Sequence, residues 1–93
     1  MNNPIVITAL REGAQGIISS IKGGGALTSR LAGMGIVTNA KFRIAQISGG
    51  LIVIQVADTR IALGRGEAAR IMVYKTTDEV CLPPVDKEIY VEW

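Results

Sequence analysis

Polar and apolar residues alternate in the stretch KFRIAQI at residues 41–47. A period of two is typical of a strand with one buried and one exposed face. Residues 51–56 are strongly apolar, which indicates a strand buried on at least one side. The sequence SGG at residues 48–50 separates the two segments, so the pattern predicts a β-hairpin.

Three further segments complete a set of five expected strands. β-branched residues favour a first strand at 17–21, before the glycines at 23–25. A polar reversal at 57–60 predicts a return strand at 61–63, and a last strand follows at 71–74 after a break at 64–66 and one helical turn at 67–70. Short strands with tight turns predict a mainly β fold, a small and partly open barrel.

One short helix is expected between the first strand and the hairpin. Leu27, Leu31 and Met34 recur at i, i+4 and i+7, which places them on one helical face. Gly33 and Gly35 supply a stop, because glycine adopts the left-handed conformation that ends helices. A helix of about nine residues is marginal alone, so its apolar face must pack on the barrel.

Chain length and composition limit the classes of protein. A chain of 93 residues makes one small domain, and 48% hydrophobic content with four aromatic residues predicts a core of aliphatic side chains. No apolar run exceeds four residues, whereas a membrane span needs about 20. The single cysteine, Cys81, has no partner for an internal disulfide. We expect a soluble, cytoplasmic protein without membrane insertion.

Charge divides the chain in two. Residues 1–74 carry eight basic and three acidic side chains, a net +5, whereas residues 75–93 carry two basic and five acidic ones, a net −3. We therefore expect a barrel domain at 5–74 and an acidic C-terminal extension at 75–93. The extension ends in IYVEW after Pro83 and Pro84, and two alternatives stay open: a disordered end, or an added strand in its own chain or in a neighbour. A strand added to a neighbour would make a homo-oligomer, and removal of residues 80–93 would then lower stability or dissolve a dimer.

Three motifs together resemble the ferrous iron transport protein A family, FeoA, over about residues 10–73. They are LREG at 10–13, RLAGMGI at 30–36 and ALGRGEAARIMV at 62–73. Two positions depart from the family pattern. Thr38-Asn39-Ala40 stands where Pro-Gly is usual, although asparagine also adopts the left-handed turn conformation. Gly64 stands where the family tends to have arginine, and Arg65 comes next.

The resemblance implies an SH3-like barrel and a role as adaptor or regulator beside a FeoB-type membrane GTPase that transports ferrous iron. Related SH3-like modules also end iron-dependent transcription repressors, where they bind protein segments. Because a fold does not fix a function, a second reading stays open: an SH3-like module of another assembly with weak nucleic-acid contact.

The residues do not favour a bound cofactor, a metal site or catalysis. The glycines at 23–25 lack the lysine and hydroxyl residue of a phosphate-binding loop, so we expect a structural turn. The chain has no histidine, and its carboxylates concentrate in the extension, so neither an iron site nor a base for a serine nucleophile is expected. Basic residues are spread evenly with few aromatic residues among them, which makes nucleic-acid binding the weaker alternative.

The expected interaction site is protein-binding. We expect a partner to contact the short helix and the turn that follows it, through five residues: Leu27, Arg30, Leu31, Met34 and Ile36. A short helix on a small barrel leaves part of its flank uncovered, and methionine suits adaptable interfaces. Arg30 would pair with an acidic group of the partner.

Overall fold

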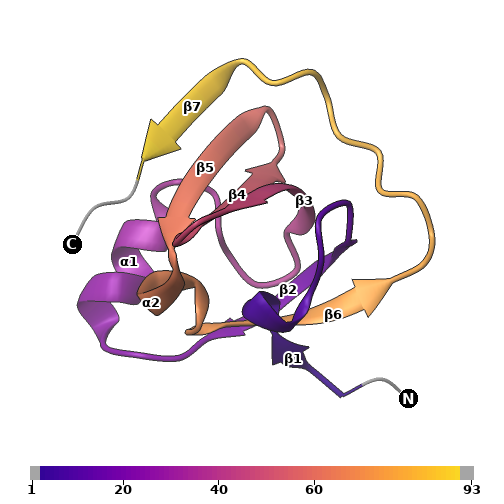
Figure 1. The fold of residues 1–93 in the computed structure, drawn as a ribbon. Helices are drawn as coiled ribbons and strands as arrows, with labels where there is room; N and C mark the ends of the chain where they lie inside the picture. Colours follow the sequence, from indigo (N-terminus) through magenta and orange to yellow (C-terminus); the bar gives the residue numbers. More distant parts are fainter. Residues whose placement is uncertain (1–2, 91–93) are drawn as a thin grey trace.

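Seven strands in one sheet form the frame of the molecule, which a computed structural model describes over residues 3–90. The strands lie in the order β1-β6-β2-β3-β4-β5-β7, and two helices lie beside them (Figure 1). In chain order the elements are β1 Ile5–Val6, the 3-10 turn η1 Ile7–Ala9, β2 Gln15–Ile21, α1 Gly25–Ala32, β3 Lys41–Ser48, β4 Leu51–Val56, β5 Thr59–Gly64, α2 Arg65–Ala68, β6 Ile71–Thr76 and β7 Lys87–Tyr90.

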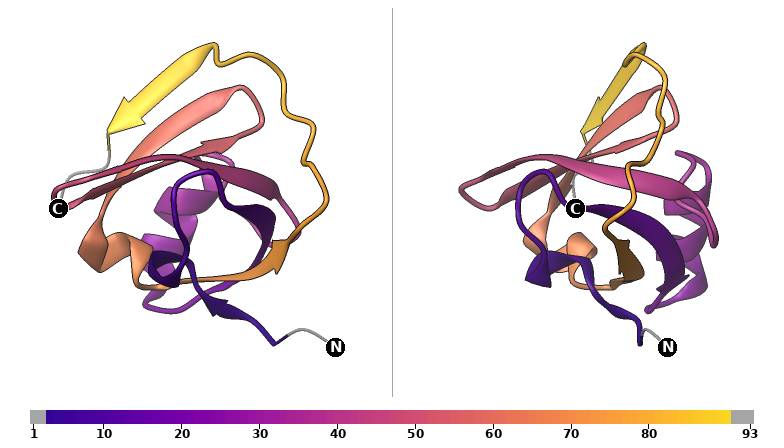
Figure 2. Two further views of the ribbon diagram at one scale, coloured as in Figure 1. Left: turned by 45° about the vertical axis from the view of Figure 1, so that its right-hand side comes forward. Right: turned by 90° about the vertical axis from the view of Figure 1, so that its right-hand side faces the viewer.

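The mainly β, SH3-like fold expected from the sequence is confirmed, and the sheet is curved but not closed (Figure 2). Five of the seven strands correspond to those expected. The two added strands are β1, which pairs with β6, and β7, which pairs with β5. Every pairing is antiparallel except that of β5 with β7.

The β3–β4 hairpin forms where the alternation predicts it, with Phe42 opposite Val56 and Ser48 opposite Leu51. The reversal after β4 is shorter than the expected 57–60. Only two residues, Ala57 and Asp58, connect β4 to β5, because Thr59 already pairs with Val56. Thr59 is buried and β-branched and belongs to the strand. The sequence predicts a turn there because its neighbours Asp58 and Arg60 are polar.

Helix α1 ends through a left-handed glycine, as expected, but only Gly35 takes that role, with φ 94°. Gly33 is helical, with φ −62°. The N–H of Ile36 donates to the carbonyl of Leu31 and the N–H of Gly35 to that of Ala32, each at 3.0 Å. This pair of bonds is the Schellman motif, and it leaves Met34 in the last turn beyond the regular helix.

The single turn α2 begins earlier than the expected 67–70. It starts directly after Gly64, whose N–H donates to Glu67 Oε1 at 3.1 Å. A carboxylate at this position satisfies an otherwise unpaired N–H at the helix start, which fixes where the turn begins.

The core is aliphatic, as the composition predicts, with Phe42 as its aromatic member. It lies inside the curved sheet, under η1 and the two helices. Its fully buried large side chains are Phe42, Ile7, Ile18, Leu31, Ile36, Ile44, Ile52, Ile54, Ile61, Leu63, Ile71 and Val73.

Candidate protein-interaction site

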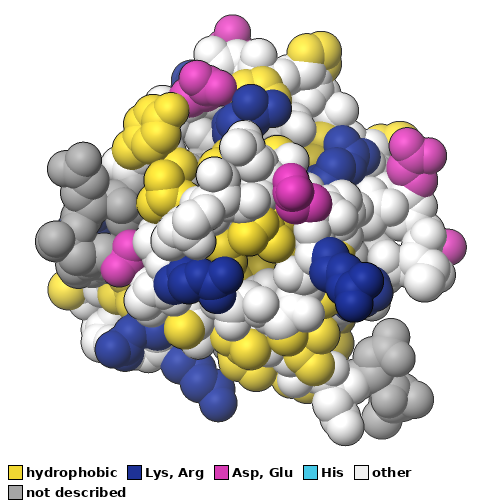
Figure 3. All heavy atoms as spheres, in the orientation of Figure 1, with side chains coloured by type: hydrophobic (Ala, Val, Ile, Leu, Met, Phe, Trp, Pro, Cys, Tyr) yellow, Lys and Arg dark blue, Asp and Glu magenta, His cyan; other side chains and the backbone are white. Residues whose placement is uncertain are grey.

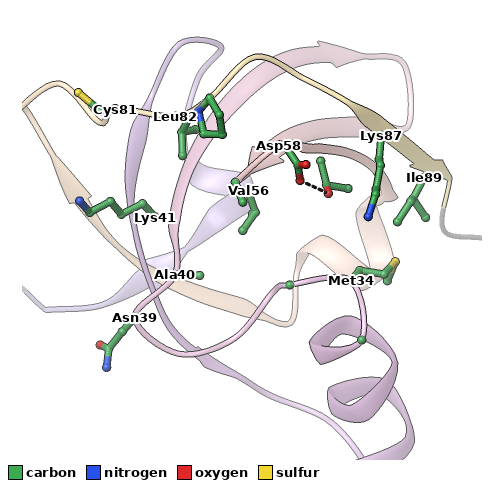
Figure 4. A pocket seen from close by; sticks show the side chains of 15 residues that line it. Met34, Asn39, Ala40, Lys41, Val56, Asp58, Cys81, Leu82, Lys87 and Ile89 are labelled. Carbon is green, nitrogen blue, oxygen red and sulfur yellow. Dashed lines mark hydrogen bonds between the residues drawn. The ribbon is translucent and has the colours of Figure 1, made fainter.

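A groove of about 710 Å³ lies between the end of α1 and the C-terminal extension. One wall is the turn Gly33, Met34 and Gly35, and the other comes from the β4–β5 turn together with parts of the extension. Figure 4 shows that Met34 and Ile89, from segments far apart in the sequence, both border the groove. The floor contains Val56 of β4, so the groove reaches the edge of the core.

The extension is held against the sheet by side chains of three strands. Gln15 of β2 accepts the N–H of Val80 at 3.0 Å, and Arg43 of β3 donates to the carbonyl of Val80. Gln55 of β4 donates Nε2 to the carbonyl of Pro83 at 2.7 Å. Val80 itself is only 6% exposed. Figures 1 and 2 show the resulting path, in which the segment after β6 runs along the outside of the sheet.

Strand β7 completes this wall by pairing in parallel with β5, from Thr59 opposite Lys87 to Ala62 opposite Tyr90. The N–H groups of Asp86 and Lys87 both donate to the carbonyl of Asp58, at 2.6 and 3.1 Å. The added strand at 87–90 therefore lies in its own chain, whereas residues 91–93 of the expected IYVEW segment lie outside the described residues.

The five residues expected to contact a partner separate into two groups. Leu27, Leu31 and Ile36 are at most 8% exposed and pack in the core. Leu31 and Ile36 are fully buried and anchor the segment to the core, whereas Leu27 also lines a depression of about 400 Å³ with Glu67 and Arg70. Arg30 is exposed, and Met34 is half-buried at the groove.

The surface of this segment also includes Val37, which is 44% exposed. We name Arg30, Met34 and Val37 the α1 edge. The Schellman turn holds Met34 and Val37 in place, because Ile36 between them is drawn into the core. In the segment expected to contact a partner, the side chains of Arg30 and Val37 are exposed and that of Met34 is half-buried.

Sequence reasoning missed the groove's second wall. Residues 56–59 carry no recognisable binding pattern, and their position depends on the two-residue turn. For the extension, the sequence left open both a disordered end and an added strand, and it did not indicate which edge such a strand would join.

Basic side chains lie apart from one another on the face of the molecule drawn in Figure 3. Figure 3 shows Lys and Arg side chains spread over one face, with uncharged atoms between them. The one ion pair found within residues 3–90 joins Arg60 of β5 to Glu88 of β7, with Nη1 and Oε1 at 3.6 Å. Both side chains are about half exposed, so the pair contributes at most about 1 kcal/mol.

The glycine loop leads from β2 into α1 and is closed by main-chain bonds. The N–H of Lys22 donates to the carbonyl of Arg70 at 2.6 Å, and Gly23 adopts φ 135°. Over residues 3–90, no three His, Cys, Asp or Glu side chains gather closely enough to hold a metal ion. None of the helices in that part of the chain is long and apolar enough to cross a bilayer.

Comparisons with known proteins agree with the motifs at residues 10–13, 30–36 and 62–73. The FeoA domain family matches residues 5–75. A protein proposed as Fe(2+) transport protein A of Methanocaldococcus jannaschii is 35% identical over 63 residues, covering 68% of this chain and 77% of that protein.

Solved structures show the same relationship. A crystal structure of an iron uptake regulatory protein, FeoA, superposes with a TM-score of 0.74 at 31% identity, over 80% of this chain and all of that one. The zinc complex of FeoA from Stenotrophomonas maltophilia superposes with a TM-score of 0.61 at 27% identity, over 69% of this chain and 82% of that one. That protein is described as an SH3 domain protein and is proposed as a ferrous iron transport activating factor. This chain belongs to the FeoA family, which is linked to ferrous iron transport.

Proposed function

We propose that this protein is a cytoplasmic accessory protein that binds a FeoB-type ferrous iron transporter and modulates it through protein contacts. The observation that carries the proposal is the family match over residues 5–75, together with a relative proposed as an Fe(2+) transport protein. The relative from Stenotrophomonas is proposed to activate such transport, which makes an accessory role the best reading for this chain.

The α1 edge and the groove beside it form the partner surface in this proposal. Met34 lines the groove and Val37 is exposed in the turn beside it, while the exposed Arg30 adds a positive charge one helical turn before Met34. An apolar centre with a charged rim is the usual composition of a protein interface, and an arginine suits a carboxylate on the partner.

The first test is capture of partners from a native lysate at moderate salt, with a nuclease-treated control, followed by mass spectrometry. Recovery of a membrane GTPase that survives nuclease supports the proposal. Recovery of nuclease-sensitive material alone contradicts it and favours the nucleic-acid alternative.

Two variants then locate the surface. Arg30→Glu with Val37→Ser is expected to lower capture of the transporter at least tenfold, because both changes alter the α1 edge. Lys75→Glu makes the same charge reversal on exposed β6 and is the matched control. Circular dichroism and the melting temperature must stay close to wild type in both. Equal loss of capture in the two variants would show that net charge, not the α1 edge, determines binding.

A further inference from the structure

The edge of β5 is occupied by a short strand from outside the FeoA domain. The family match ends at residue 75, and β7 begins at Lys87 after the segment 77–86, which contains no helix or strand. Within the described residues, which end at Tyr90, four positions of β7 pair with β5. Three of them, Lys87, Glu88 and Tyr90, are exposed, with Tyr90 at 70%.

Packing around β7 is incomplete on both sides. Lys87 and Ile89 line the groove of about 710 Å³, and Glu88, Ile89 and Tyr90 line a second depression of about 90 Å³ with Arg60 and Ala62 of β5. Side chains beside open space lose contacts that a filled interface would make. Ile89 is the one residue of β7 that packs against the core. The strand is thus docked by main-chain pairing, one aliphatic anchor and the exposed Arg60–Glu88 pair.

Main-chain pairing at a sheet edge does not depend on sequence, so the side-chain positions define which strand fits. The residue at position 88 lies beside Arg60, which favours a carboxylate there. The residue at position 89 packs against the core, which favours an aliphatic side chain there.

We propose that the β5 edge is a docking site for an extended segment of another protein. That segment pairs in parallel with β5 and carries an acidic residue followed by an aliphatic one. Strand β7 is the tethered occupant that it displaces. The site borders the α1 edge, because Met34 and Ile89 line the same groove, but the proposal does not require the transporter as partner.

The open space beside β7 favours a strand from another protein over β7 of a second copy. A short tether gives β7 an effective concentration in the millimolar range, so an identical strand from another molecule gains no contact over the resident one. A foreign segment with larger side chains fills the two depressions that β7 leaves open, and this additional contact is what allows it to displace the tethered strand.

The test uses the full chain and a fluorescein-labelled peptide PPVDKEIY, the sequence of residues 83–90. In the variant Glu88→Lys with Ile89→Asp, the tethered strand loses its ion pair and its anchor. We expect this variant to bind the peptide at least tenfold more tightly than wild type in fluorescence anisotropy. Glu79→Lys, with the same charge change on an exposed residue of the extension, is the matched control and should bind like wild type. Absence of saturable binding to the first variant overturns the proposal.

Charge exchange tests the register. Adding Arg60→Glu to the variant Glu88→Lys with Ile89→Asp should lower its affinity for the peptide severalfold. A peptide that carries Glu88→Lys should restore that affinity. Failure of the exchanged pair to recover binding places the peptide elsewhere and contradicts the proposal.

Two measurements on the wild-type protein test the proposal if the variant Glu88→Lys with Ile89→Asp does not fold. Hydrogen exchange of wild type should show Lys87 and Ile89 amides exchanging at least tenfold faster than those of Ile52 and Ile54; equal protection contradicts displacement of β7. The second measurement is the oligomeric state. If wild type forms a dimer and the substitutions in β7 abolish it, the β5 edge binds a second copy of this chain, and the proposal of a foreign segment is overturned.

Discussion

At the scale of single residues, two positions other than glycine, Asn39 and Ala57, adopt the left-handed conformation. Asn39 has φ 74°, and its N–H donates to the carbonyl of Ile18 at 2.8 Å. The sequence predicts this conformation, since asparagine tolerates it. Ala57 has φ 53° in the β4–β5 turn, which nothing in its local sequence predicts. A side chain with a Cβ is strained there, and the two-residue connection imposes the strain.

Replacing Ala57 by glycine should therefore stabilise the protein. We expect Ala57→Gly to raise the free energy of unfolding by about 0.5–1 kcal/mol, because relief of left-handed strain of roughly 1–2 kcal/mol exceeds the entropy cost of glycine. Ala69→Gly is the control, since Ala69 has an ordinary φ of −63° and should lose stability. Urea unfolding checks both, and a destabilised Ala57→Gly variant would show that the turn is not strained.

Gly16 is required for a different reason, the close approach of two strands. A Cβ at Gly16 would lie 2.0 Å from the carbonyl oxygen of Tyr74 on β6, which is backbone and cannot rotate away. We expect Gly16→Ala to destabilise the protein by roughly 2 kcal/mol or more, since the β2–β6 pairing must shift.

The matched control for that change is Gly50→Ala, where a Cβ meets nothing within 4 Å. Thermal unfolding compares the two variants. Equal melting temperatures would mean that β2 and β6 separate without cost and would contradict the pairing.

At the scale of elements, the extension depends on one buried amide. Gln55 is 8% exposed, and its Nε2 donates both to the carbonyl of Ala57 at 2.9 Å and to that of Pro83 at 2.7 Å. It therefore joins the β4–β5 turn to the extension, the two parts of one wall of the groove. Sequence patterns read Gln55 as a polar interruption of an apolar strand, and only the path of the extension explains why this position holds an amide.

Replacing Gln55 by methionine keeps the side-chain volume but removes both hydrogen bonds. We expect Gln55→Met to lower the free energy of unfolding by about 1–2 kcal/mol and to speed amide exchange at Lys87, because the carbonyl of Pro83 loses its donor. Gln46→Met, on an exposed position of β3, should stay within about 0.5 kcal/mol of wild type. Unchanged exchange at Lys87 would show that Gln55 does not hold the extension.

At the scale of the whole molecule, the barrel and its extension form one folded unit. Val80 is buried and Ile89 packs on the core, although both lie beyond the residues that the family match covers. Burial of two aliphatic side chains is worth a few kcal/mol before the entropy of ordering the segment is subtracted.

Removal of residues 80–93 should lower stability without abolishing folding. We expect a loss of roughly 2 kcal/mol and a fall in melting temperature of several degrees, with unfolding still cooperative. Val85→Ser changes an exposed residue of the same segment and should melt like wild type. An unchanged melting temperature after truncation would mean that the extension is not docked. Elution volume, measured in parallel, tests whether the extension also joins two copies.

How far the sequence predicts this molecule differs from element to element. The β3–β4 hairpin and the apolar face of α1 were predictable because each depends on neighbours a few residues away. β1 was not, because two residues carry no periodicity. Of the expected interaction residues, Leu27, Leu31 and Ile36 proved to be core, since an apolar stripe looks the same whether it faces the barrel or a partner.

The sequence by itself determined the strand-rich SH3-like fold, the aliphatic core and the family, because periodicity, glycine positions and motif spacing are local properties of the chain. Tertiary structure alone decided that the extension joins β5 in parallel, that Met34 and Ile89 share a groove, and that Ala57 is strained. Those features depend on long-range pairing, where main-chain hydrogen bonds accept almost any sequence and packing across the fold selects one arrangement.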